Sequence, residues 1–173
     1  MLRIAVFLLA FSLAPCAQVA NSGTLQPPAT LDRNLYPPDA NAKADIRAAL
    51  VQAAREKKHV IVEFGALWCL DCHILDNAFK TPGAKDVLDA NYVVVHVDVG
   101  RYDKNLDIAK QYKVPLAKGI PAMAVLDARG KVLVSNQAGE FQAARRMKME
   151  DVVAFLNRWK PGASKKSKVQ SAK

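Results

Sequence analysis

One strand-to-helix junction constrains the fold of this chain more than any other feature. Residues 59–64 form an apolar, β-branched run with the length of a buried strand. Directly after it, residues 68–72 (Trp-Cys-Leu-Asp-Cys) open a segment in which the second cysteine, Leu75 and Phe79 share one helical face. A buried strand followed by an amphipathic helix is typical of α/β proteins. The junction therefore predicts an α/β domain with two cysteines at the start of a helix.

The position of the two cysteines favours redox chemistry. A thiol at a helix N-terminus faces free backbone N–H groups and the positive end of the helix dipole, which stabilise its thiolate. The thiolate is the form that attacks disulfides. Cys69 and Cys72 are separated by two residues, so they can close a reversible disulfide. The pair indicates a redox-active dithiol.

The first twenty residues have the features of a secretory signal peptide. Arg3 gives a positive start, residues 4–14 are almost wholly apolar, and small residues follow. The apolar run is too short to cross a bilayer, which needs about 20 residues. We therefore expect residues 1–20 to be a signal peptide, cleaved after Ala17 or Ala20, and the protein to be periplasmic or secreted.

A second interpretation of the same region concerns Cys16. Residues 13–16 (Leu-Ala-Pro-Cys) also resemble a bacterial lipoprotein box, which would anchor the protein through Cys16, although Pro15 departs from the small residue expected there. Either outcome leaves Cys69 and Cys72 as the only cysteines of the folded domain, because the chain has 3 in all. A structural bridge closing so short a loop would add little stability.

The composition separates two ends from one domain over residues 43–159. Residues 21–42 contain Pro27, Pro28, Pro37 and Pro38 and predict an extended linker, and residues 160–173 predict a disordered, lysine-rich tail. Of the net charge of +9, five positive charges are lysines of the tail and one is Arg3, which leaves +3 between residues 21 and 159. This distribution gives no support for a nucleic-acid partner.

Hydrophobic periodicity predicts the order of elements within the domain. A leading helix over residues 43–57 precedes the strand at 59–64 and the dithiol helix. A short helix over 84–90 then leads into the strand 92–98, whose nearly unbroken apolar run is typical of a strand buried in a parallel sheet. Asp103 is expected to cap the next helix. Strands at 122–126 and 131–135, joined by a tight turn, precede a last helix over 150–159.

Several separate residues make residues 43–159 resemble the thioredoxin superfamily. Members carry Trp-Cys-x-x-Cys after the first core strand, as residues 68–72 do here. They also have an acidic residue six positions before the first cysteine, where Glu63 stands, and a cis-proline after a pair such as Gly-Ile, as in residues 119–121. The likeness extends to small periplasmic thioredoxin-like oxidoreductases and to the soluble C-terminal domain of transmembrane disulfide reductases. It implies a three-layer fold, with a central mixed β-sheet and helices on both faces.

The resemblance also implies catalytic roles. Cys69 would attack a substrate disulfide and form a mixed disulfide, and Cys72 would resolve it. Glu63 would accept or relay the proton of Cys72. The expected activity is that of a protein-disulfide oxidoreductase, a reductase or isomerase, that needs no cofactor.

Three residues are expected to bind the substrate. Trp68 would cover one side of the dithiol, and Ile120 and Pro121 would lie opposite it. A proline donates no backbone hydrogen bond, which leaves that strand edge open to an extended substrate. The implied partners are proteins with disulfides and a membrane disulfide reductase as electron donor. An insert over residues 136–148 and a longer approach to the proline over 114–118 depart from plain thioredoxin.

Asp71 bears on the direction of electron flow. Strong oxidants of the superfamily often have a histidine just before the second cysteine, where this chain has Asp71. A carboxylate there disfavours the thiolate of Cys69 and opposes a helix-terminus effect of roughly 0.3–1 kcal/mol. The sequence therefore predicts a reducing dithiol.

Three other functions compete for the same residues. The run from Cys69 to His73 matches the attachment motif of c-type haem, with Met123, Met147 or Met149 as distal ligands. The two thiols and the imidazole of His73 could instead bind copper or zinc, although the sequence contains no second ligand cluster. An intact dithiol argues against a third possibility, a non-catalytic binding module.

Overall fold

The computed structural model describes residues 23–163. The expected signal peptide, Cys16 and residues 164–173 of the tail lie outside this range. The helices and strands follow in the order α1 (Ala42–Glu56), β1 (His59–Gly65), α2 (Leu70–Lys80), α3 (Ala84–Asn91), β2 (Tyr92–Asp98), α4 (Leu106–Gln111), η1 (Leu116–Lys118), β3 (Ala122–Leu126), β4 (Val132–Ser135), η2 (Ala144–Arg146) and α5 (Met149–Trp159). The predicted order is confirmed.

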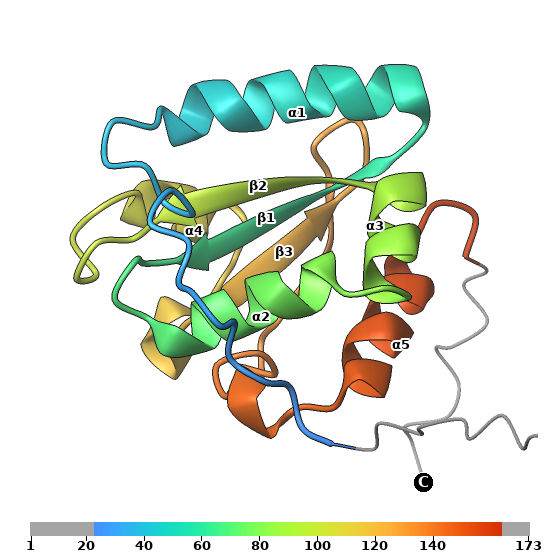
Figure 1. Cartoon of the computed structure of the whole chain (residues 1–173). Helices are drawn as coiled ribbons and strands as arrows, with labels where there is room; N and C mark the ends of the chain where they lie inside the picture. Colours follow the sequence, from blue (N-terminus) through green and yellow to red (C-terminus); the bar gives the residue numbers. More distant parts are fainter. Residues whose placement is uncertain (1–22, 164–173) are drawn as a thin grey trace, which may run out of the picture.

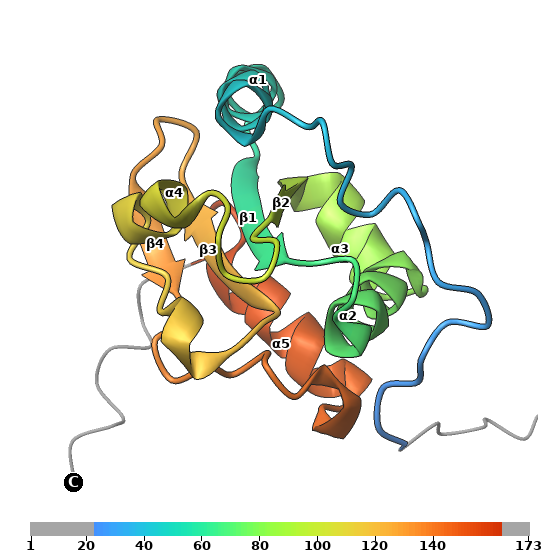
Figure 2. The same cartoon turned by 90° about the vertical axis from the view of Figure 1, so that its left-hand side faces the viewer.

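The four strands form one mixed sheet in the order β2-β1-β3-β4. β1 pairs in parallel with β2 and antiparallel with β3 (Figure 1), and β3 pairs antiparallel with β4 (Figure 2). β2 was expected to be buried within a parallel sheet, and this expectation is wrong. It is an edge strand, and four of its seven residues are partly exposed because no strand covers its outer side.

Helices cover both faces of the sheet, which confirms the three-layer architecture. α1 and α4 pack with the side chains of one face, including Val60, Val62 and Phe64 of β1. α2, α3 and α5 pack against the opposite face, which includes Ile61 (Figures 1 and 2). Because side chains alternate along a strand, Glu63 and Gly65 share the face of Ile61 and point toward α2.

The N-terminal segment (residues 23–41) is part of the packed domain. It contains no helix or strand, as an extended linker would, but the side chains of Leu25, Leu35 and Tyr36 are buried. The Leu25 N–H donates to the Met147 carbonyl at 2.8 Å, and Asp32 pairs with Lys80 of α2 at 3.4 Å. The segment differs from a free linker because these apolar side chains fill space beside α2 and the sheet.

The prediction that Asp103 caps a helix is wrong. α4 begins at Leu106, with Asn105 in the capping position. The carboxylate of Asp103 instead accepts a hydrogen bond from the Arg101 N–H at 2.9 Å. Asp103 therefore closes the turn before the helix.

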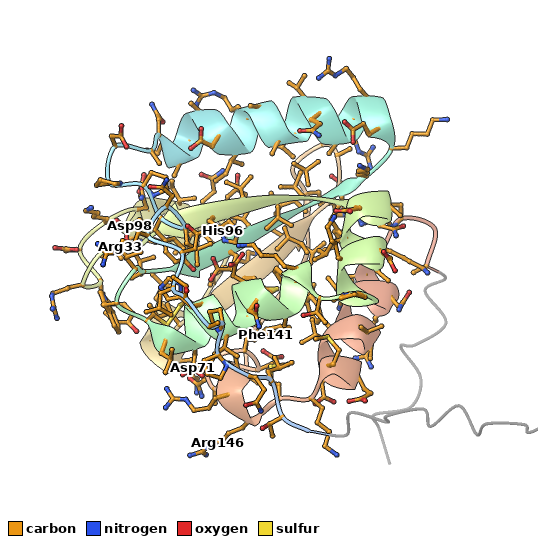
Figure 3. The ribbon with its side chains drawn as sticks, viewed as in Figure 1. Arg33, Asp71, His96, Asp98, Phe141 and Arg146 are labelled. Atoms are coloured by element: carbon orange, nitrogen blue, oxygen red, sulfur yellow. A yellow bond between two sulfur atoms is a disulfide. The ribbon has the colours of Figure 1, made fainter. Side chains whose placement is uncertain are left out.

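The insert over residues 136–148 packs against the helices below the sheet. Phe141 is 1% exposed, and its ring meets that of Phe155 of α5 edge-on at 4.9 Å (Figure 3). The η2 turn follows and lies beside α2. Within residues 23–163, no helix combines the length and apolar character that a bilayer crossing requires.

Candidate active site

The two cysteines stand at the N-terminus of α2, as the sequence predicts. Cys69 is the N-cap residue, and the Cys72 N–H points at Cys69 Sγ at 3.2 Å. The two residues are joined by a disulfide, with their α-carbons 5.3 Å apart. After reduction, the same N–H and the helix dipole stabilise a thiolate on Cys69.

Both cysteines are buried in the disulfide form. Cys69 is 6% exposed and Cys72 is 1% exposed. Around them, Leu67, Trp68 and Leu70 are each more than 40% exposed. Cys69 is therefore surrounded by a rim of exposed apolar side chains.

Trp68 is fixed by contacts with the loop that follows β2. Its indole Nε1–H donates to the Gly100 carbonyl at 2.8 Å, and its ring lies 6.3 Å from that of Tyr102. Half of the Trp68 side chain stays exposed. Trp68 thus presents a fixed apolar surface beside the dithiol.

Ile120 and Pro121 lie against the attacking sulfur. The peptide bond between them is cis, and the Ile120 carbonyl oxygen is 3.6 Å from Cys69 Sγ. Pro121 directly precedes β3 and has no N–H to offer. The cis peptide therefore places a backbone carbonyl, and no proline N–H, beside Cys69.

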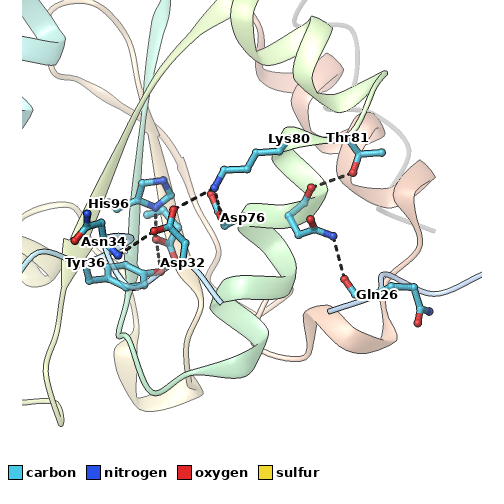
Figure 4. A network of polar contacts seen from close by, with 10 residues as sticks. Gln26, Asp32, Asn34, Tyr36, Asp76, Lys80, Thr81 and His96 are labelled. Atoms are coloured by element: carbon cyan, nitrogen blue, oxygen red, sulfur yellow. Dashed lines mark hydrogen bonds and ion pairs between the residues drawn. The ribbon is translucent and has the colours of Figure 1, made fainter. Parts of the chain in front are cut away.

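Glu63 is buried and held by two side chains. It is 2% exposed, and the Tyr36 hydroxyl donates to its two oxygens at 2.8 and 3.0 Å (Figure 4). His96, its register partner on β2, places Nδ1 3.0 Å from Glu63 Oε2. These contacts satisfy a carboxylate that would otherwise be costly to bury.

Glu63 also alters the titration of both partners. Burial lowers the pKa of His96, but the hydrogen bond and charge of Glu63 outweigh it and raise that pKa above its usual value. Burial, followed by the charge and hydrogen bond of Glu63, raises the pKa of Tyr36 well above its usual value. Tyr36 therefore stays a neutral hydroxyl donor across the physiological pH range.

Because Gly65 has no side chain, the Tyr36 hydroxyl and Cys72 Sγ can both lie close to its α-carbon. A Cβ at this position would overlap the Tyr36 hydroxyl and stand 2.9 Å from Cys72 Sγ. The hydroxyl and the sulfur are therefore close neighbours above the same glycine. A side chain at position 65 would displace one or both groups.

Asp71 is paired with an arginine of the insert. Its carboxylate accepts hydrogen bonds from the Arg145 backbone N–H at 2.9 Å and Nε–H at 3.0 Å, and it also binds the Arg145 Nη2 group. Burial raises the pKa of Asp71, but the Arg145 contacts outweigh it and lower that pKa. The sequence prediction treated Asp71 as a free negative charge beside Cys69. The structure corrects this, because Arg145 compensates that charge.

Comparisons with known proteins agree with this geometry. Residues 41–128 match the family model described as thioredoxin-like. The chain belongs to the thioredoxin-like family. It is 32% identical to the disulphide isomerase from Xylella fastidiosa Temecula1, with a TM-score of 0.67, over 70% of this chain and 92% of that structure.

Two further comparisons with this thioredoxin-like chain involve one much longer protein and one structure of lower sequence identity. It is 31% identical to protein disulfide isomerase-like 2-2 of Oryza sativa subsp. japonica over 66% of this chain, but it spans only 27% of that protein. The oxidised C-terminal domain of DsbD from Neisseria meningitidis is 16% identical, with a TM-score of 0.48, over 69% of this chain and 96% of that one. The chain has the dithiol of a protein-disulfide oxidoreductase.

His73, the histidine of both metal-based alternatives, is buried in α2 of this thioredoxin-like domain. It is 1% exposed, and its Nε2 is 2.9 Å from the Leu67 carbonyl oxygen. A haem or metal bound through Nε2 would have to break this contact, whereas Nδ1 has no hydrogen-bond partner among the described residues. In the part of the chain that the structure describes, no three His, Cys, Asp or Glu side chains gather as a metal site.

The structure brings all the predicted site residues together and adds three that the sequence reasoning missed. The predicted residues are Glu63, Trp68, Cys69, Cys72, Ile120 and Pro121, and their individual roles stay predictions. The added residues are Tyr36, His96 and Arg145. His96 could have been found by pairing the two parallel strands in register. For Tyr36 and Arg145, the sequence offers no local signal.

Proposed function

We propose that this chain is an exported thiol–disulfide oxidoreductase that reduces or isomerises disulfides in protein substrates. The single observation that carries the proposal is the placement of Cys69 Sγ. It lies at the N-cap of α2, 3.2 Å from the Cys72 N–H and 3.6 Å from the Ile120 carbonyl oxygen. One side stabilises a thiolate, and the other offers a backbone edge to a substrate.

The reaction proceeds by two thiol–disulfide exchanges. The Cys69 thiolate attacks one sulfur of the substrate disulfide, the substrate S–S bond breaks, and the other substrate sulfur leaves as a thiolate. Cys72, as a thiolate, then attacks Cys69 Sγ and releases the second substrate sulfur. The substrate gains two electrons, and the protein is left with the Cys69–Cys72 disulfide seen here.

The direction of electron flow rests on how strongly the reduced form is stabilised. Because Arg145 compensates Asp71, the carboxylate opposes the Cys69 thiolate less than the sequence suggests. The helix N-terminus then favours the thiolate by roughly 0.3–1 kcal/mol. This small effect is compatible with reductase or isomerase work, and it is far from the stabilisation that makes a strong oxidant.

Export and the electron donor complete the proposal. Residues 1–20 support export through their charge and apolar pattern. A reductase outside the cytoplasm must be reduced again after each turnover. A membrane disulfide reductase is the donor we propose, because it can deliver electrons across the membrane.

Reduction of insulin disulfides in the presence of dithiothreitol tests the activity. We expect the wild-type chain to accelerate the reaction and Cys69→Ser to abolish the acceleration. A Cys69→Ser variant that keeps the wild-type rate contradicts the proposal. An absorption spectrum of the same preparation tests the haem alternative, since covalently bound haem would give a Soret band.

A further inference from the structure

The hydroxyl of Tyr36 contacts the proposed proton acceptor and lies close to the resolving sulfur. It donates to Glu63 Oε2 at 2.8 Å, and it lies with Cys72 Sγ above the α-carbon of Gly65. The residue comes from the N-terminal segment, ahead of the residues 41–128 that match the family. Tyr36 is 3% exposed, and Leu35 beside it is buried as well, so the hydroxyl has a fixed position.

We infer that Tyr36 relays the proton of Cys72 to Glu63 when the mixed disulfide is resolved. This inference rests on the proposed function. It assigns a further catalytic residue to the second exchange step, and it explains why β1 carries a glycine at position 65. The hydroxyl stands where a Cβ would project.

The proton movement balances within these groups. The Tyr36 O–H points at the Glu63 carboxylate, which leaves lone pairs on the Tyr36 oxygen to accept a hydrogen bond from the Cys72 thiol. As Cys72 attacks Cys69 Sγ, its proton passes to the Tyr36 oxygen, and the proton of Tyr36 passes to Glu63. Tyr36 ends the step as a neutral hydroxyl, and Glu63 ends it as a carboxylic acid.

His96 gives the proton a route to solvent. Its Nδ1 lies 3.0 Å from Glu63 Oε2, and its side chain is 25% exposed. His96 is also one of the residues that line an open groove of about 390 Å³ between the N-terminal segment, α1 and β2. The other charged groups that act on this cluster are Asp98 at the end of β2 and Asp76 and Lys80 on α2.

Single-turnover kinetics of the full chain with oxidised glutathione test the relay. Acid quenching and mass spectrometry follow the glutathione adduct on Cys69 as it forms and decays. For Tyr36→Phe at pH 7 we expect formation within twofold of wild type and decay slowed roughly tenfold or more, since proton transfer by a positioned group contributes factors of this size. The deficit should shrink as pH rises, because Cys72 then ionises without help.

Tyr92→Phe is the matched control. Tyr92 also buries its hydroxyl, which donates to the Leu156 carbonyl at 2.6 Å, but it starts β2 at the end of the sheet away from the dithiol. We expect this variant to lose stability without slowing the decay of the adduct. Equal slowing in both variants would reduce Tyr36 to a structural role and overturn the inference.

The double variant Glu63→Gln with Tyr36→Phe tests whether the two residues carry the same proton or act independently. If both residues act on one proton, the double variant should decay no more than about twofold slower than the slower single variant. Decay of the Tyr36→Phe adduct at the wild-type rate would overturn the relay and leave the proposed function intact. If wild type forms no adduct on Cys69, the proposed function itself fails.

Discussion

At the scale of single residues, the site is governed by which charges are compensated. Glu63 is buried with a tyrosine hydroxyl and an imidazole, and Asp71 is paired with Arg145. A buried carboxylate without such partners would destabilise the fold and disturb the neighbouring sulfurs. The pairing of Asp71 leads to a specific prediction about Cys69.

Arg145→Gln should make Cys69 a poorer nucleophile near neutral pH. Without the guanidinium, the negative charge of Asp71 acts on the Cys69 thiolate from within the first turn of α2. We expect the rate of attack at pH 7 to fall about two- to fivefold, since such surface effects are under about 1 kcal/mol. The rate of iodoacetamide alkylation of the reduced chain against pH measures the change.

The neighbouring arginine provides the control for this prediction. Arg146 is exposed (Figure 3), and among the described residues the hydrogen bonds of Asp71 come from Arg145 alone. Arg146→Gln should therefore alter the alkylation rate much less than Arg145→Gln. Identical effects from the two variants would mean that overall charge, rather than the pairing with Asp71, controls Cys69.

At the scale of elements, the N-terminal segment behaves as part of the core. Leu35 is 6% exposed and packs with Tyr36 and residues of α1 and the sheet. Its position decides where the Tyr36 hydroxyl stands. The packing of this segment therefore matters to both stability and the dithiol.

Leu35→Ala should lower the free energy of unfolding by about 2 to 5 kcal/mol, the usual cost of removing a buried leucine side chain. Leu31→Ala, in the same segment but 46% exposed, should change it by no more than about 0.5 kcal/mol. Urea unfolding of both variants measures the difference. If Leu35→Ala is as stable as Leu31→Ala, the segment is only loosely attached to the domain.

At the scale of the whole molecule, local signals in the sequence predict the order of helices and strands, the family resemblance implies the three-layer fold, and long-range contacts complete the site. Strand and helix periodicity and the residues around Cys69 depend on neighbours in the chain, so they could be predicted. Tyr36 reaches Glu63 across 27 positions, and Arg145 reaches Asp71 across 74. Such contacts form only when the tertiary fold brings segments that are distant in the sequence close together. The burial of Leu25, Leu35 and Tyr36 was missed because the prolines and weak periodicity of residues 21–42 resemble a linker.

The edge position of β2 was missed for a related reason. Its apolar run is real, but strand order is a property of the whole sheet. An edge strand with one face under α1 and the other near α3 carries apolar residues on both faces, as a central strand does. The composition of a strand therefore does not distinguish the two positions.

The central claim is that Cys69 attacks and Cys72 resolves, and trapping of the mixed disulfide tests it most directly. A Cys72→Ser chain, mixed with a protein disulfide and analysed by non-reducing electrophoresis and peptide mapping, should hold the substrate through Cys69. Cys69→Ser should hold almost none, because Cys72 is 1% exposed. Substrate captured through Cys72 instead, or by neither variant, would contradict the account.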